Sequence, residues 1–265
     1  MAVSIEKSWA IQKSVIYALF VRELNSRFGR YRLGYLWAVL EPLALVGVLS
    51  AVRLIFGSKD IAGLPYPIFF AAGIIPFYLF QHIVNQSLSA VESNLALMNY
   101  QRVKPSDAVV SRVLLESVIA LAVGVIFFAG FYKMGFTFEW NSTLGTIAVV
   151  LLLIAFSTGI GLIVAVIAPL YQETKKVIPV LIRPFFFISG IFFAADSLPS
   201  QYRELALYNP LMQMTELIRM QMFQNYTSQY GSMSYFAICS MISLFIGLAV
   251  YRINRIKLAT SGSIR

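Results

Sequence analysis

The amino-acid sequence predicts an all-α membrane protein. It has six transmembrane helices, an N-terminal interfacial amphipathic helix and an outer re-entrant helical hairpin before the last span. The composition is the first observation, because 58% of the residues are apolar and 12% are charged, against about 45–50% and about 25% in soluble domains. The second is a mean hydropathy of +0.74 over the whole length, so apolar residues are not confined to one core. The third is a series of long, mostly uncharged runs.

Six runs are long enough to cross a bilayer as helices. They lie at 36–56, 68–88, 113–132, 144–170, 177–195 and 233–251. The run at 144–170 contains no charged residue, whereas Glu41 and Arg53 interrupt the first run. Arg53 is close to the end of its run, where a long side chain reaches the membrane interface. We therefore expect a single domain over 1–265, with a six-span bundle at 35–252 between an N-terminal segment at 1–34 and a tail at 253–265.

The placement of basic residues predicts the orientation. Fifteen of the 21 Lys and Arg residues fall on one side of the predicted bundle, four fall on the other, and Arg53 and Arg183 lie inside spans. Basic residues in short connections stay in the cytoplasm, so we expect both termini to be cytoplasmic. The net charge of +9 is then explained by orientation, and we expect no nucleic-acid partner.

Two segments outside the spans carry apolar residues. In the N-terminal segment, seven apolar side chains recur at helical spacing with charges between them, namely Trp9, Val15, Ile16, Leu19, Phe20, Leu24 and Phe28. This pattern favours an amphipathic helix in the inner interface; the alternative is a basic leader that only sets orientation. The connection at 196–231 is long, apolar and punctuated by Pro199 and Pro210. It favours a buried re-entrant hairpin, and the alternative is an amphipathic helix lying flat on the outer surface.

The residue inventory argues against catalysis in this chain. It has one cysteine, Cys239, and one histidine, His82, and it lacks the nucleophile-elbow, H-E-x-x-H and P-loop motifs. Six spans of about 20 residues leave no connection long enough for a nucleotide-hydrolysing domain. We therefore predict that the chain is not an enzyme and holds neither a metal nor a cofactor, so that a partner chain binds any ATP and Mg²⁺.

Polar residues inside the spans are few. Glu41 and Glu116 are the only acids well inside spans, and we expect each to pair with a base such as Arg112 or to line a conduit. His82 is expected to be a hydrogen-bonded packing residue rather than a proton carrier. Small residues four apart allow close helix contact; they occur at Gly47 and Ala51, Ala120 and Gly124, and Ala155 and Gly159.

The fifth run combines a cation with aromatic rings. Residues 183–193 contain Arg183 and five phenylalanines, and helical spacing places Phe185, Ser189 and Phe192 on one face. An intramembrane arginine faces a wet interior or an anion, and flat rings beside it suit sugar rings. The pattern predicts a path for an anionic carbohydrate, and the alternative is lipid-facing or core packing.

Three motifs resemble the permeases of ABC polysaccharide exporters, which include the capsule, O-antigen and teichoic-acid exporters. The first is the run from Arg27 to Pro42, with its Leu-Gly-Tyr-Leu-Trp core and a proline five residues after Trp37. The second is Asn-Leu-Ala-Leu-Met at 94–98 with Pro105 later, and the third is Asn-Pro-Leu at 209–211 followed by Arg219. The resemblance covers roughly residues 10–255, and the Glu41-Pro42 pair is most similar to Gram-negative capsule exporters. Gln213 departs from it, since many members have histidine there.

The resemblance implies a permease in the bacterial inner membrane that exports a lipid-linked polysaccharide. Its implied partners are a second copy of the chain, two ATP-binding-cassette ATPase subunits, a periplasmic or outer-membrane export partner, and membrane lipid. The competing interpretations are an ABC exporter of a small molecule or drug, and a membrane-embedded transferase acting on lipid-linked sugars.

We assign expected roles on this basis. Residues 94–106 are expected to form a coupling helix that docks on the ATPase, with the alternative of an ordinary basic loop; its contact residues are Asn94, Leu97, Met98, Tyr100, Arg102 and Lys104. The conduit wall, facing the second copy, is expected to consist of Tyr35, Trp37, Arg183, Phe185, Ser189 and Phe192. Asn209, Pro210 and Arg219 are expected to gate the outer exit. Arg27, Arg30 and Arg32 are expected to hold an anionic lipid head group at the cytoplasmic entrance, with a purely orienting role as the alternative.

Overall fold

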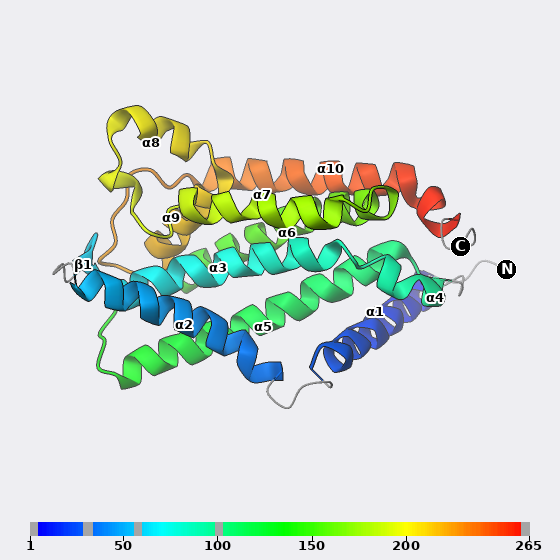
Figure 1. The fold of residues 1–265 in the computed structure, drawn as a ribbon, viewed down its shortest axis with the longest axis horizontal. Coiled ribbons are helices and arrows are strands. Elements are labelled where there is room, and N and C mark those ends of the chain that lie inside the picture. The colour runs from blue at the N-terminus through cyan, green and yellow to red at the C-terminus, as the bar shows by residue number, and fades with distance from the viewer. Residues whose placement is uncertain (1–4, 29–33, 56–59, 99–102, 261–265) are drawn as a thin grey trace.

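The protein is described by a computed structural model covering residues 5–28, 34–55, 60–98 and 103–260 (Figure 1). The long helices are α1 (Ile5–Phe28), α2 (Gly34–Ile55), α3 (Tyr66–Ser87), α5 (Pro105–Lys133), α6 (Thr143–Leu170), α7 (Thr174–Ile188) and α10 (Met233–Thr260). The shorter elements are β1 (Asp60–Ile61), β2 (Leu64–Pro65), η1 (Glu92–Asn94), α4 (Leu95–Met98), η2 (Ala195–Ser197), α8 (Ser200–Leu207) and α9 (Pro210–Met222).

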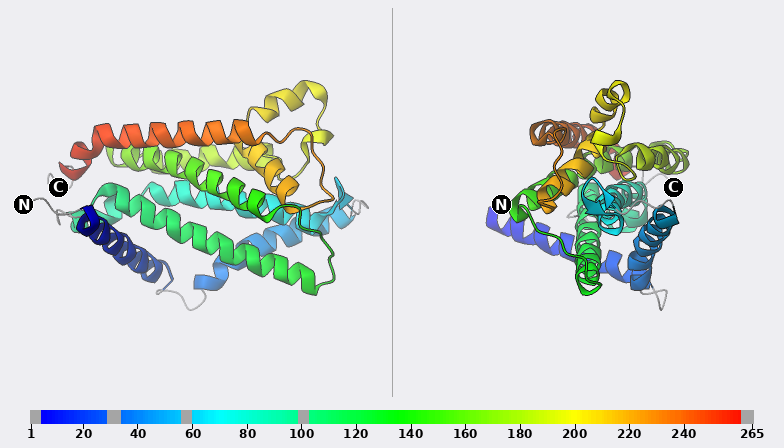
Figure 2. Two further views of the ribbon diagram at one scale, coloured as in Figure 1. Left: turned by 180° about the vertical axis from the view of Figure 1, so that it is seen from behind. Right: turned by 90° about the vertical axis from the view of Figure 1, so that its left-hand side faces the viewer.

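The long helices run lengthwise in an elongated bundle (Figures 1 and 2). The start of α1, the short helix α4 and the end of α10 lie together at one end, which we call the terminal end. The β1 strand and the helices α8 and α9 lie at the other, which we call the far end. Helices α3, α5, α6, α7 and α10 run along the bundle, and α2 runs obliquely from near its middle to the far end. Consecutive helices of the series α2, α3, α5, α6, α7 and α10 run in opposite directions.

Helix α3 is the centre of the core. It packs against α2, α5, α6, α7 and α9, and 72% of its most apolar 18-residue window is buried, against 11% for α2. The fully buried Phe69, Ile74 and Phe77 fill the space between these neighbours. Helix α3 is therefore a well-packed interior helix, while α2 presents most of its apolar surface outward.

Local sequence signals set where the elements begin. Pro105 and Pro210 occupy the first turns of α5 and α9, where the missing N–H costs nothing. The Ser142 hydroxyl accepts a hydrogen bond from Gly145 N at 3.0 Å, and the Asn209 side chain accepts one from Leu211 N at 3.0 Å, so both cap helix starts. Between β1 and β2, Ala62 and Gly63 have φ of 49° and 81°, which is the geometry of a tight hairpin turn.

The span prediction holds for five of the six runs. Among the described residues, five helices are long and apolar enough to cross a membrane, namely Leu36–Ile55, Tyr66–Ser87, Pro105–Lys133, Thr143–Leu170 and Met233–Arg255. The prediction of one helix over 177–195 is wrong at its end, because α7 has 15 residues and stops at Ile188. Gly190, with φ of 71°, and the hydrogen bonds from α9 described below hold the following residues in a turn.

The segments outside the spans also differ from expectation. The prediction that the connection 196–231 is buried holds for α9, with ten buried residues, but is wrong for α8, which has none. Helix α1 forms, and five of its seven predicted apolar-face residues are buried or partly buried, whereas Trp9 is exposed; the five are Val15, Ile16, Leu19, Phe20 and Leu24. The predicted helix over 94–106 is interrupted, because Lys104 is extended and Pro105 begins α5.

Close packing by small residues occurs between α6 and α10. A side chain at Gly159 would overlap the backbone of Ser243, and Gly247 faces Gly159 directly. The Ser243 hydroxyl donates to Phe156 O at 2.9 Å across the same contact. By contrast, Gly47 and Gly124 have open space at the Cβ position. Of the predicted small-residue pairs, the one containing Gly159 therefore serves helix contact within this chain.

Replacing Gly159 with leucine should separate α6 from α10, because its side chain would occupy the Ser243 backbone position. Overpacking of this kind costs about 1–3 kcal/mol, so we expect a lower thermal unfolding midpoint in detergent and a smaller monodisperse fraction. Gly124→Leu is the matched control, since nothing lies within 4 Å of its Cβ position. Equal effects of the two substitutions would contradict the assigned contact.

Candidate functional site

The terminal end contains a buried polar cluster centred on Arg112 of α5. We define the Arg112 cluster as Arg112, Glu23, Gln86, Ser89 and Ser93. The guanidinium donates to Glu23 Oε1 at 3.0 and 3.1 Å, to Ser89 Oγ at 2.8 Å, to Ser93 Oγ at 2.6 Å and to Gln86 O. One side chain, itself only 5% exposed, thus joins α1, α5, the end of α3 and η1.

Three further polar contacts surround this cluster. Arg22 of α1 donates to Asn94 Oδ1 at 2.6 Å and to Ser93 O at 3.0 Å. Lys175 of α7 pairs with Glu92 of η1. Gln12 of α1 donates to Asp107 of α5. The 3-10 turn η1, which precedes α4, is therefore bonded to α1, α5 and α7.

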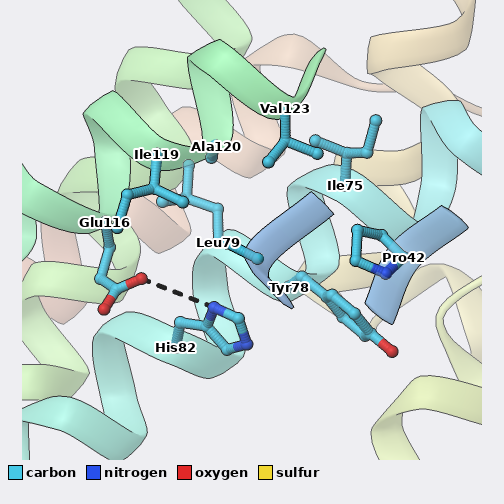
Figure 3. Close-up of a pocket in the computed structure, with 10 residues that line it drawn as sticks. Pro42, Ile75, Tyr78, Leu79, His82, Glu116, Ile119, Ala120 and Val123 are labelled. Carbon is cyan, nitrogen blue, oxygen red and sulfur yellow. Dashed lines mark ion pairs between the residues drawn. The ribbon is translucent and has the colours of Figure 1, made fainter. Parts of the chain in front are cut away.

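A cavity lies between α2, α3 and α5, beside the Arg112 cluster (Figure 3). Pro42, Leu79 and Val123 are among its apolar lining residues, and His82 Nδ1 lies 3.5 Å from Glu116 Oε2 at its polar side. The Glu116 side chain is 3% exposed and that of His82 is 28% exposed. Glu116 was expected to pair with a base such as Arg112 or to line a conduit; it lies beside the base His82 and lines this cavity, whereas Arg112 pairs with Glu23. His82 is a partner of a buried acid and stacks on Tyr78.

The far end contains a second buried arginine, Arg219 of α9. Its guanidinium donates to Gly190 O at 2.7 Å, Phe69 O at 3.1 Å and Ile191 O at 3.3 Å. It also lies over the Phe69 ring, 3.5 Å from the centroid. The side chain has no exposed area. Arg219 therefore joins α9 to the start of α3 and to the turn after α7.

Neighbouring polar residues of α9 complete this network. Glu216 Oε1 accepts from Ala195 N at 2.9 Å and Oε2 accepts from the Tyr226 hydroxyl at 2.8 Å. Burial raises the pKa of Tyr226 above its usual range, and the nearby Glu216 raises it further, so this hydroxyl remains a donor at physiological pH. Gln213 donates to Leu207 O and accepts from Ser232 N. The amide at position 213 thus links α8 to the start of α10.

The predicted conduit residues do not share one face. The side chains of Trp37, Arg183 and Phe185 are exposed on α2 and α7. Ser189 is fully buried, and Phe192 packs against the rings of Phe186 and Phe187. The prediction that Phe185, Ser189 and Phe192 share one helical face is wrong, because α7 ends before Ser189. Tyr35 lies in α2, but its side chain is outside the described residues.

The predicted exit residues are structural contacts at the far end. Asn209 caps α9, and its Nδ2 donates to Ser189 Oγ at 3.2 Å; Pro210 fills the first turn. Of the coupling residues, Asn94 is buried against Arg22, Leu97 is partly buried and Lys104 is exposed. Tyr100, Arg102, Arg30 and Arg32, and the side chains of Met98 and Arg27, lie outside the described residues.

Sequence reasoning missed several polar residues in and around the two arginine networks. Glu23 and Arg22 lie in the segment predicted as an amphipathic helix and were given no partners, although an acid within a basic segment is a signal for an internal partner. Thr215 and Glu216 sit among apolar residues at 211–218, and two polar residues in an apolar segment indicate bonds to backbone. Glu92, which pairs with Lys175, carries no such signal because its surroundings in the sequence are polar.

Comparisons with known proteins give matches over most of the chain, and these matches point to one family. Residues 14–223 match the family described as ABC-2 type transporter. The chain is 40% identical over 251 residues to the polysialic acid transport protein KpsM of Escherichia coli, covering 95% of this chain and 97% of that protein. It is 28% identical to the capsule polysaccharide export inner-membrane protein CtrC of Neisseria meningitidis, covering 92% of each. It is 27% identical to the corresponding protein BexB of Haemophilus influenzae, covering 93% of each.

A double-mutant cycle tests the Arg112 cluster. Arg112→Met leaves the partly buried Glu23 without its cation, so we expect destabilisation of up to about 3–5 kcal/mol, as for a broken buried pair. Glu23→Gln should be destabilising too, and the double variant less than additive, because the same interaction is lost twice. Thermal unfolding in detergent reports all three, with Arg252→Met, an exposed site on α10, as the control. Additive effects would contradict the direct pairing.

Proposed function

Because the chain belongs to the ABC-2 type transporter family, we propose that it is the membrane-spanning subunit of an exporter of capsular polysaccharide. It is a multi-pass protein of the bacterial inner membrane and not an enzyme. The observation that carries this proposal is 40% identity to a polysialic acid transport protein over nearly the full length of both chains. Relatives from two other genera are likewise capsule polysaccharide export proteins of the inner membrane.

The bundle supports six crossings of the membrane, with both termini of the chain in the cytoplasm. Helix α7 runs antiparallel to α6 and α10 along the length of the bundle, so it serves as the remaining crossing although it is short. Lys175, Lys176 and Lys104 lie toward the terminal end together with the last basic residues of α10. Positive residues favour the cytoplasmic side, which makes the terminal end cytoplasmic and the far end periplasmic.

A separate ATPase supplies the energy in this proposal and binds ATP and Mg²⁺. The segment η1–α4 is the proposed docking element, because it is at the cytoplasmic end and is bonded to α1, α5 and α7. ATPase closure displaces η1, and the Arg112 cluster passes this displacement to α1 and α5. The charged contacts act as the two-state element whose equilibrium the ATPase biases.

A second copy of the chain supplies the other half of the conduit. Helices α2 and α7 lie on the same side of the bundle in the end-on view (Figure 2). Both present large exposed apolar side chains, among them Leu43, Val48, Val180 and Leu181. Trp37, Arg183 and Phe185 are exposed on these two helices and remain the proposed wall for a lipid-linked polymer. Tyr35 and the entrance arginines Arg27, Arg30 and Arg32 keep their expected roles as part of the proposal.

The role of Arg183 is tested in cells that lack their own copy of this permease. Arg183→Ala removes the exposed cation in the apolar part of α7, so we expect surface capsule to fall at least tenfold while the assembled complex is retained. Arg183→Lys keeps the charge and should retain export. Surface polysaccharide is measured by antibody binding to intact cells, with the wild-type gene and an empty vector as references. Wild-type capsule levels with Arg183→Ala would remove this residue from the conduit.

ATPase docking is tested at the end of α4. Met98→Asp and Tyr100→Asp replace apolar residues of the proposed docking segment with a charge, so we expect the ATPase subunit to be lost on affinity purification. Tyr171→Asp is the control, since Tyr171 is exposed in the α6–α7 connection at the same end. If both variants retain full stoichiometry, the docking surface lies elsewhere on the cytoplasmic end.

A further inference from the structure

Residues 189–195, which we call the α7 turn, form an irregular segment where the sequence favours a helix. They continue the apolar run of α7 with Ile191, Phe192, Phe193, Ala194 and Ala195, yet α7 ends at Ile188. Gly190 alone does not explain the break, because glycine in a helix costs only about 1 kcal/mol relative to alanine. The cause must lie in contacts from other parts of the chain.

Helix α9 supplies these contacts. The Thr215 hydroxyl donates to Ser189 O at 2.6 Å, and Arg219 donates to Gly190 O at 2.7 Å and to Ile191 O at 3.3 Å. Glu216 accepts from Ala195 N at 2.9 Å. Four backbone groups of the turn are thus bonded to three side chains of one helix. A Cβ at Gly190 would overlap Met212 Sδ, so α9 also fits closely against the turn.

The turn is therefore held by side chains rather than by its own backbone pattern. Backbone groups away from water require hydrogen-bond partners, and the α9 side chains substitute for the bonds that a longer α7 would make internally. A continued α7 would satisfy these carbonyl groups internally, and Arg219 would keep Phe69 O and the Phe69 ring as its partners. This exchange of partners makes the segment suited to two states, one bonded to α9 and one continued as helix.

The aromatic contacts depend on which state is present. In the turn, the rings of Phe187 and Phe192 stack with centroids 5.5 Å apart and planes 10° apart. In a continuous helix of 3.6 residues per turn, two residues five apart point about 140° from each other. The stack therefore breaks when the turn becomes helical, and the Phe192 ring leaves its contacts with Phe70 and Phe186.

We propose that the α7 turn is the moving part of the outer gate, and that Thr215 and Arg219 are positioning residues that hold it in one state. This inference rests on the proposed export function. The fully buried Arg219 acts on the gate through the turn and not by touching the polymer. Winding seven residues onto α7 lengthens it by about 10 Å. The change moves α8, because Arg203 of α8 donates to Ala195 O, Asp196 O and Leu198 O.

Hydrogen–deuterium exchange on the complete permease–ATPase complex tests this inference. We expect amides of 189–195 to change their exchange rates at least tenfold between the nucleotide-free complex and the complex trapped with a non-hydrolysable ATP analogue. Amides in the buried half of α3 should not change. Equal exchange of 189–195 in the two nucleotide states would overturn the inference.

Substitutions at Thr215 separate positioning from general stability. Thr215→Val removes the bond to Ser189 O, so we expect about tenfold faster exchange at 189–195 in the nucleotide-free complex, whereas Thr215→Ser keeps the donor and should restore the wild-type rate. Thr158→Val is the matched control, since the Thr158 hydroxyl donates to Ile154 O within its own helix. If Thr215→Val behaves like Thr158→Val, α9 does not position the turn.

The two levels of the proposal fail separately. If wild-type protein neither restores surface capsule nor retains an ATPase, the export function is wrong. If it does both but 189–195 exchanges equally in the two nucleotide states, only the gate is wrong.

Discussion

Buried polar groups must find partners within the protein, and this constraint is clearest at two buried arginines. Each of them binds several acceptors from different parts of the chain. Arg112 collects side-chain and backbone acceptors from α1, α3 and η1 near the terminal end. Arg219 collects backbone carbonyls from α3 and from the turn after α7 near the far end. Leaving either cation unpaired is costly in a low-dielectric interior, so both positions constrain the helices around them.

The two clusters lie at opposite ends of the same rigid element. Helix α3 is buried along its length, and it contributes Gln86 O to one cluster and Phe69 O to the other. Helices α2 and α7 pack less and leave apolar surface exposed. This division suits the proposed export mechanism, in which the interior helix carries displacement while α2 and α7 change their contacts with a second copy.

Long uncharged runs were sufficient to predict most of the fold. Five of the six runs became helices that fit a membrane span, because hydrophobic length is a local property of the sequence. The end of α7 was not predictable in this way, since Thr215 and Arg219 lie more than 20 residues away from the carbonyl groups they bind. The same reason hid the Glu23–Arg112 pair, whose members are 89 residues apart. The motif that contains Asn209 and Arg219 pointed to this region, but the sequence did not predict that both residues bind other parts of the same chain.

The central claim is that this chain provides the path for a polymer and that a separate ATPase supplies the energy for its movement. The most direct measurement uses vesicles that contain the purified permease with its ATPase and a lipid-linked capsular polysaccharide. Movement is followed by protection of the polymer from a glycosidase that is confined to one side. The account predicts protection that requires ATP and both subunits. Protection by the permease alone, or ATP hydrolysis by the full complex without any polymer movement, would contradict it.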